Sequence, residues 1–172
     1  MIGWRDNTGL LRPYRGWNVI IGGEQNVTRT NLTTSYKQLF EWLRDYMAVD
    51  TVTLLLPLAN RLYLTVQATV GLQVEIDQQI HIPIGQGIAG RIAASMQPMI
   101  VNDLAEVEVF SPVLHQKGLQ SLLGVPLFLK QGVVGVLHVG TFHLRHFTQS
   151  DEQQLQLVAH RVSLTLAPIL LG

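Results

Sequence analysis

The chain has 172 residues, 47% of them hydrophobic, and its acidic and basic residues balance to a formal net charge of +0. This length suits one domain with a sizeable core, and the neutral balance provides no overall field that would attract nucleic acid. No cysteine is present, which excludes disulfides, thiolate metal ligands and cysteine nucleophiles. Without a long apolar run or a signal-peptide pattern, we expect a cytoplasmic protein with no membrane partner.

The first thirty residues differ in character from the rest of the chain. They are rich in glycine and arginine, contain Trp4 and Trp17, and show little periodicity. Two interpretations are open: a short strand through the alternating Trp17, Val19 and Ile21, or a leader or upstream linker lying over the domain. We place the boundary near Thr30, which gives a leader at 1–30 and one domain at 31–172.

The middle of the chain predicts alternating helices and extended segments. Apolar residues from Tyr36 to Met47 recur at i, i+3, i+4 and i+7, which indicates an amphipathic helix over 31–47. Beyond this helix, turn residues separate several β-branched runs. We expect strands at 51–56 and 61–70, extended segments at 78–84 and 99–101, a helix at 87–95, and a helix or tight loop at 111–117.

A hairpin is predicted from two apolar runs, Ser121–Leu129 and Val133–Val139, joined by a short segment that contains Gly132. Neither run alternates apolar with polar residues, so both faces must be covered by other elements. Side-chain alternation assigns Leu122 and Leu123 to opposite faces, and places Val134, Val136 and His138 together on one face.

A long amphipathic helix is predicted to close the chain. Thr148 and Asp151 have capping-box spacing, and Pro168 is expected to bend or end the helix. Besides its main apolar stripe, the helix carries a second edge at Leu157, Leu164 and Leu171, which suggests a second packing partner.

For two motifs, a structural role is a better explanation than a binding site. Gly85–Gly90 matches G-x-G-x-x-G, but Pro83 interrupts the strand before it and the following helix is short, so close packing explains these glycines better than a dinucleotide. His143 and His146 provide only two neighbouring ligands, so we expect no metal site. His138 stands in an apolar strand, and it either forms a hydrogen bond within the core or reaches into a cavity.

Three segments taken in order closely resemble a GAF domain: IHIPIGQGIAGRIAASMQPMIVNDL, FSPVLHQKGLQSLLGVPLFLKQGVVGVLHVGTF and HFTQSDEQQLQLVAHRVSLTLAPIL. The likeness is greatest to sensor modules of bacterial histidine kinases, as in two-component systems, and of stress-pathway serine phosphatases. It implies an α+β, three-layer α/β/α (profilin-like) fold with a central antiparallel sheet in the order 2-1-5-4-3. It also implies a homodimer through the first and last helices, and an output kinase or phosphatase domain in the full-length protein.

The resemblance also allows several subclasses to be compared with this sequence. Bilin-binding members and free methionine sulfoxide reductases of this fold use cysteines, which this chain lacks. Members that bind cyclic nucleotides share an Asn-Lys pair, which is also absent, and Asp151 and Glu152 are explained by helix capping. No nucleophile–base arrangement is evident. We therefore expect a sensory domain that is not an enzyme and has no cofactor.

The resemblance places a small-molecule pocket on the sheet face that carries Gly124 and His138, and Gly124 and Gly140 should leave space there. The expected alternative is a dimerisation and signal-transmission module with no ligand. A cavity of a few hundred Å³, the usual size of a ligand site, would favour sensing, and a filled core would favour transmission. We predict that the ligand contacts Thr53, Leu55, Leu122, Gly124, Val136 and His138 on the sheet, and Ile88, Ile92, Phe110 and Val113 in the roof.

Overall fold

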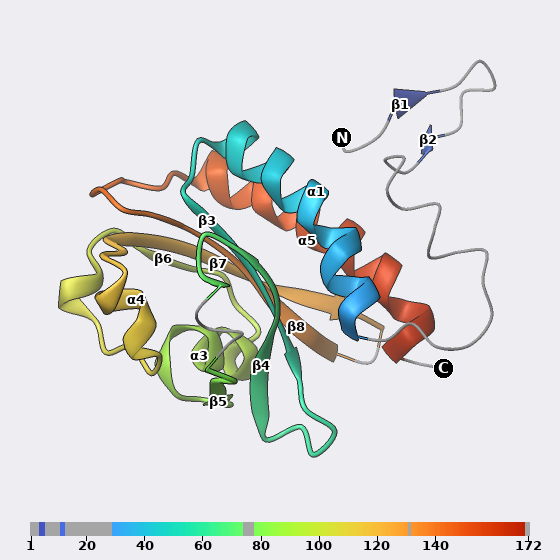
Figure 1. Cartoon of the computed structure of the whole chain (residues 1–172), viewed down its shortest axis with the longest axis horizontal. Coiled ribbons are helices and arrows are strands. Elements are labelled where there is room, and N and C mark those ends of the chain that lie inside the picture. The colour runs from blue at the N-terminus through green and yellow to red at the C-terminus, as the bar shows by residue number, and fades with distance from the viewer. Residues whose placement is uncertain (1–3, 6–10, 13–28, 74–77, 131, 171–172) are drawn as a thin grey trace.

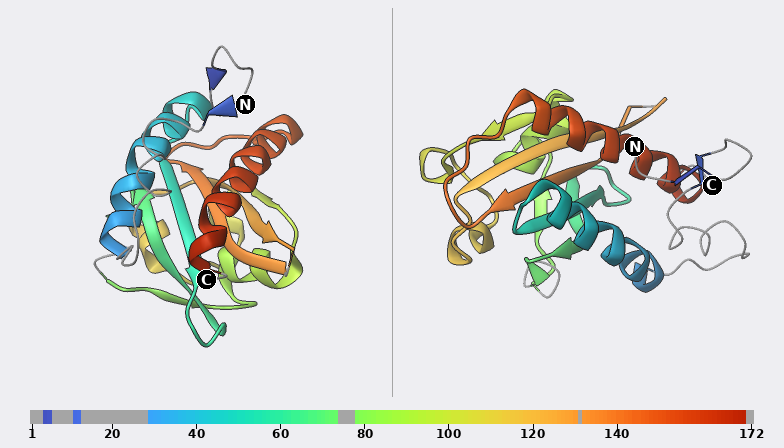
Figure 2. Two further views of the ribbon diagram at one scale, coloured as in Figure 1. Left: turned by 90° about the vertical axis from the view of Figure 1, so that its right-hand side faces the viewer. Right: turned by 90° about the horizontal axis from the view of Figure 1, so that it is seen from above.

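The computed structural model describes residues 4–5, 11–12, 29–73, 78–130 and 132–170, and for 4–5, 11–12, 29–35 and 169–170 it describes the backbone only. A six-stranded antiparallel sheet forms the middle layer. Helices α1 (Arg29–Met47) and α5 (Gln149–Leu170) cover one face, and α3 (Gly87–Ser95) and α4 (Pro112–Gln116) cover the other (Figure 1). Figure 2 shows α1 and α5 crossing the same face of the sheet from two further directions.

The strand order is β5-β4-β3-β8-β7-β6, so the predicted α+β class is confirmed but the predicted order of five strands is not. The difference is a sixth strand, β5, which pairs with the start of β4 at the edge of the sheet. The strands are β3 (Thr51–Pro57), β4 (Tyr63–Val70), β5 (His81–Pro83), β6 (Met99–Val101), β7 (Ser121–Leu129) and β8 (Gly132–Thr141).

Smaller elements complete the chain. A 3-10 turn, η2 (Leu104–Glu106), follows β6. Strands β1 (Trp4–Arg5) and β2 (Leu11–Arg12) pair with each other in a separate two-stranded sheet. The strand considered at Trp17–Ile21 lies outside the described residues. Among the helices described here, none is both long and apolar enough to cross a membrane.

The sheet separates two apolar cores, as the hairpin sequence predicts. The helix-side core lies between the sheet and α1 and α5, and it contains Leu123, Val125 and Leu137. The pocket-side core lies under α3 and α4, and it contains Leu122 and Val136. Leu122 and Leu123 are 1% and 0% exposed, so adjacent residues of β7 are fully buried in different cores.

The predicted placement of Val134 is wrong, and of the two outcomes expected at Pro168, a bend or an end of the helix, the second does not occur. Val134 packs in the helix-side core rather than beside Val136, because the register of β7 and β8 shifts between Leu127 and Phe128. The last helix continues through Pro168 to Leu170. Proline so close to a helix end removes only one hydrogen bond, which makes the continuation inexpensive.

Arg145 joins the ends of the two long helices. Its Nη1 donates to the carbonyl oxygens of Met47 (2.7 Å) and Ala48 (3.0 Å), at the C-terminal end of α1. Its Nη2 donates to Asp151 Oδ1 (3.2 Å) in the first turn of α5. Asp151 also accepts from the Thr148 amide at 2.8 Å, which completes the predicted capping arrangement.

We predict that Arg145→Ala lowers the free energy of unfolding by about 2–3 kcal/mol, because it leaves two helix-end carbonyls and a largely buried carboxylate without their charged donor. Chemical denaturation measures the loss. Arg44→Ala is the matched control, since Arg44 pairs with its exposed neighbour Asp45 and the change should cost less than about 0.5 kcal/mol. Equal losses in the two variants would contradict this role for Arg145.

Candidate functional site

A small cavity lies in the pocket-side core, between β5, α3, the start of α4 and the centre of the sheet. Its volume is about 20 Å³, which is enough for roughly one water molecule. No residue that lines it carries a formal charge when His138 is neutral. The lining residues are Ile82, Ile88, Ala89, Phe110, Ser111, Leu114, Leu122 and His138.

The structure brings part of the predicted site to this cavity. Four predicted residues line it: Ile88, Phe110, Leu122 and His138. The other six are buried near it without lining it: Thr53, Leu55, Ile92, Val113, Gly124 and Val136. Four further lining residues were not predicted: Ile82, Ala89, Ser111 and Leu114. The alternation of Ile80, Ile82 and Ile84 could have indicated one apolar face of the β5 segment.

The expected open space at Gly124 and Gly140 is absent, which corrects that prediction. A Cβ on Gly124 would lie 2.5 Å from Ile92 Cδ1, and one on Gly140 would lie 2.9 Å from both terminal carbons of Leu119. Missing side chains in a close-packed core are normally compensated by their neighbours, and here two roof residues extend into the notches. Among the described residues, the cavity beside His138 holds about 20 Å³, far less than the few hundred Å³ that would favour sensing.

A row of polar side chains crosses the floor of the site. Thr53 of β3 is paired on one side with Thr69 of β4 and on the other with His138 of β8, and Gly124 of β7 follows. The two threonine hydroxyls lie 2.8 Å apart and satisfy one another. His138 Nδ1 is buried and has no hydrogen-bond partner in the part of the chain that the structure describes.

Burial determines the charge of His138. The residue is 4% exposed, and desolvation lowers its pKa from 6.5 to about 4. The ring is therefore neutral at pH 7, and a neutral imidazole has one donor and one acceptor nitrogen. Of the two alternatives that the sequence left open, the geometry agrees with a histidine that reaches a cavity.

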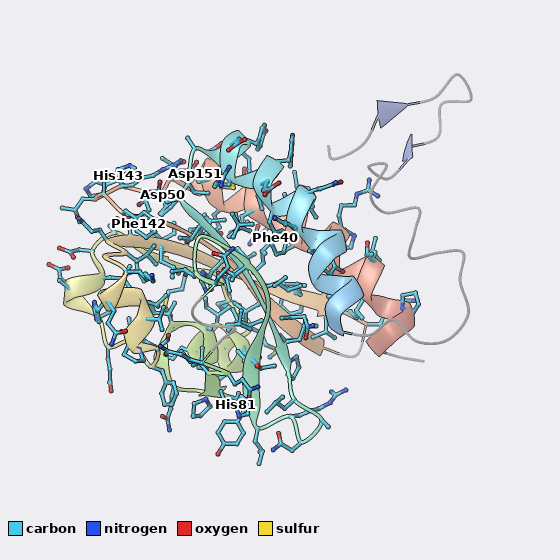
Figure 3. All side chains as sticks on the ribbon, in the orientation of Figure 1. Phe40, Asp50, His81, Phe142, His143 and Asp151 are labelled. Carbon is cyan, nitrogen blue, oxygen red and sulfur yellow. The ribbon has the colours of Figure 1, made fainter. Side chains whose placement is uncertain are left out.

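The other motifs form no second site. Gly85 donates its amide to the Gly90 carbonyl at 2.8 Å, and a Cβ on Gly90 would collide with the Pro83 carbonyl oxygen, so this turn serves to pack α3 against β5. His143 is exposed near Asp50 at one end of the molecule, far from His81 (Figure 3). The described residues include no group of three His, Cys, Asp or Glu side chains that could hold a metal ion.

We predict that acid destabilises the protein through His138. In the unfolded chain His138 becomes protonated below about pH 6.5, whereas in the folded protein it stays neutral down to about pH 4. The free energy of unfolding therefore falls by roughly 3 kcal/mol between these two pH values. His138→Leu should remove this part of the pH dependence and cost little stability at pH 7, since no partner is lost. Urea unfolding at pH 7.0 and 4.5 measures both. The prediction would be contradicted if the free energies of unfolding of the two proteins fell equally between pH 7.0 and 4.5. A large loss of stability in His138→Leu at pH 7 would also contradict it.

Comparison with known proteins supports the fold. The family model for the GAF domain matches residues 31–166. The GAF domain of a phosphoenolpyruvate-protein phosphotransferase from Coxiella burnetii superposes with a TM-score of 0.72 at 17% identity, covering 89% of each chain. A free methionine-R-sulfoxide reductase from Neisseria meningitidis superposes with a TM-score of 0.67 at 19% identity, covering 87% of this chain and 83% of that one. These identities support a shared fold only.

Two curated relatives are similar in sequence. The free methionine-R-sulfoxide reductase of Escherichia coli is 28% identical over 152 residues, which cover 84% of this chain and 81% of that protein. The HTH-type transcriptional activator RamA of Corynebacterium glutamicum is 29% identical over 112 residues. That alignment covers 63% of this chain and 39% of RamA, so the similarity is to a part of a longer protein.

These relatives contradict the expectation that the chain is not an enzyme. The reductases are enzymes with the same fold, and the Escherichia coli protein is similar over most of this chain. That expectation rests on the absence of thiols and of a familiar catalytic arrangement in the sequence. The absence of cysteine excludes thiol chemistry by these residues, but it does not exclude other chemistry.

Proposed function

This chain belongs to the GAF family, and we propose that it is a regulatory module that binds a small molecule against the pocket side of its sheet and transmits binding to α1 and α5. The observation that carries the proposal is the unpartnered nitrogen of His138 beside a cavity, within the described part of the chain. A buried polar atom without a partner is uncommon in folded proteins and often indicates a missing water or ligand.

The packing offers a route from the pocket to the helices. On the pocket side, Ile92 of α3 sits against Gly124 of β7. On the opposite face of the same strand, Leu123 and Val125 pack in the core that α5 covers. A ligand that displaces α3 would therefore act on a strand that directly supports α5.

Arg145 extends this route to α1, because it holds the ends of both helices. Its backbone amide donates to Ser121 Oγ at 2.8 Å, at the start of β7. The Ser121 hydroxyl donates in turn to the carbonyl oxygen of Asn102 at 2.6 Å, just before η2. The loop that borders the pocket-side core is thus hydrogen-bonded to the residue that joins α1 and α5.

The alternative is a dimerisation and signal-transmission module that takes no ligand. The filled notches at Gly124 and Gly140 favour it, because little free volume remains. Exposed apolar residues on the outer helices are consistent with a homodimer in both proposals. They are Tyr46 on α1, which stacks on Trp42, and Leu157 and Leu164 on α5.

Such a module would control an output domain in a longer protein. The sequence resemblance suggests a kinase or a phosphatase. The similarity to part of RamA adds a transcriptional activator to the outputs that this chain could accompany.

We predict that the purified protein retains a small molecule from an extract of its host's metabolites, detected by native mass spectrometry. Ala89→Val fills the cavity with two added methyl groups and should abolish retention. Leu157→Ala, on the exposed face of α5, should retain the molecule and serves as the control. If no molecule is retained by the unmodified protein, the module without a ligand is the better account.

We predict a dimer in solution at tens of micromolar, an order expected for a modest apolar interface. Leu164 is 50% exposed on α5, and Leu164→Glu should weaken the dimer at least tenfold without unfolding the protein. Leu144→Glu is the matched control, since Leu144 is 60% exposed in the loop before α5. Sedimentation velocity measures both. A monomer at this concentration, or equal weakening by the two changes, would contradict the interface.

A further inference from the structure

We infer that the pocket is a gated site for a small uncharged molecule with a hydrogen-bond donor on an apolar body, and that the side chain of Ile92 is the gate. The ligand would take the place of the Ile92 terminal methyl group in the notch of Gly124 and would donate to His138 Nδ1. This inference rests on the proposed function and specifies the ligand class and the residue that controls access.

The charge of the ligand follows from the lining. Six of the eight lining residues are apolar, and the remaining two are Ser111 and His138. Arg91 is the cation of α3, but its Nε donates to the Gly87 carbonyl at 2.8 Å and its Nη2 to the Glu108 carbonyl at 3.4 Å. An ionic ligand would lose its hydration without gaining an opposite charge, which is costly in an apolar core.

The hydrogen-bond donor follows from the polar atoms on the floor. The Thr53 and Thr69 hydroxyls are already paired with each other. His138 Nδ1 is buried and unpaired within the described residues. We assign the proton of the neutral ring to Nε2, which makes Nδ1 the acceptor. The atom that faces Nδ1 should therefore belong to an N–H or O–H group.

The gate follows from the notch beside His138. Gly124 is the direct cross-strand partner of His138. A Cβ on Gly124 would lie 2.5 Å from Ile92 Cδ1 and 3.4 Å from His138 Cβ, so the methyl group occupies the space next to the histidine. Ile92 is 0% exposed, so its terminal methyl group would have to turn away before a ligand could occupy this space.

This ligand class differs from the substrate named for the reductase relatives. Free methionine sulfoxide carries an ammonium and a carboxylate group, and a site for it needs charged or strongly polar partners for both. None of the residues that line the cavity here is charged at pH 7. The residues that line this cavity therefore offer no charged partner to either group of free methionine sulfoxide.

Matched probes of nearly equal size test the inference. Pyrrole is uncharged and has an N–H donor, furan has the same shape without a donor, pyrrolidinium is a cation of similar size, and acetate is a small anion. Each is titrated into the unmodified protein, Ile92→Ala and Ile92→Val, and the ¹⁵Nδ1 resonance of His138 reports binding. Ile92→Val removes the terminal methyl group alone and keeps the test valid if Ile92→Ala does not fold.

We expect pyrrole to bind the Ile92 variants at least tenfold more tightly than the unmodified protein, because the gate no longer has to open. Furan should bind the variants about two- to tenfold more weakly than pyrrole, and the ions should not bind measurably. Val162→Ala makes a cavity in the helix-side core and should not shift the His138 resonance when pyrrole is added.

Three outcomes overturn the inference: no binding of any probe, equal binding of furan and pyrrole, or binding of either ion as tightly as pyrrole. If pyrrole binds the unmodified protein and the Ile92 variants with equal affinity, Ile92 is not the gate. The proposed function fails separately, when the unmodified protein retains no metabolite. The probe ranking is measured in the variants and does not depend on that result.

Discussion

Leu122 and Leu123 are neighbours in one strand, yet each is fully buried in a different core. A hairpin that is apolar on both faces is stable only if both are covered, and α1 and α5 cover one while α3 and α4 cover the other. The same strand lies against Ile92 of α3 on one face and contributes to the core beneath α5 on the other. This shared strand is the structural basis of the transmission that we propose.

The space beside Gly124 on the pocket side of the sheet is closed by a neighbouring side chain. Glycine at 124 leaves room for a methyl group from the roof, and Ile92 supplies it. His138 Nδ1 is one of three buried side-chain polar atoms without a partner among the described residues, together with the Tyr36 hydroxyl and Thr51 Oγ1. It lies between a satisfied threonine pair and that methyl group. A polar atom kept in such a place costs stability. This is the place where our proposal puts a ligand.

The sequence alone predicted the elements whose patterns are local. Capping by Thr148 and Asp151, the helix at Gly87–Ser95 and the two-faced hairpin all follow from residue types at fixed spacing. The bulge that moves Val134, the added edge strand His81–Pro83 and the filling of the glycine notches depend on neighbours distant in the chain, so periodicity could not reveal them. For the same reason only four of the ten predicted site residues, Ile88, Phe110, Leu122 and His138, reach the cavity. Catalysis was excluded too readily, because a missing residue type excludes one chemistry only.

The contact between Ile92 and Gly124 is the most direct test of this account, since it closes the pocket beside His138. Methyl NMR of the ligand-free protein measures it through nuclear Overhauser effects from the Ile92 δ1 methyl group. The account predicts strong effects to the Gly124 α protons and the His138 β protons, with one dominant Ile92 side-chain conformation. Their absence, with an Ile92 methyl group that averages over several conformations, would show that the pocket is open and would contradict the gate.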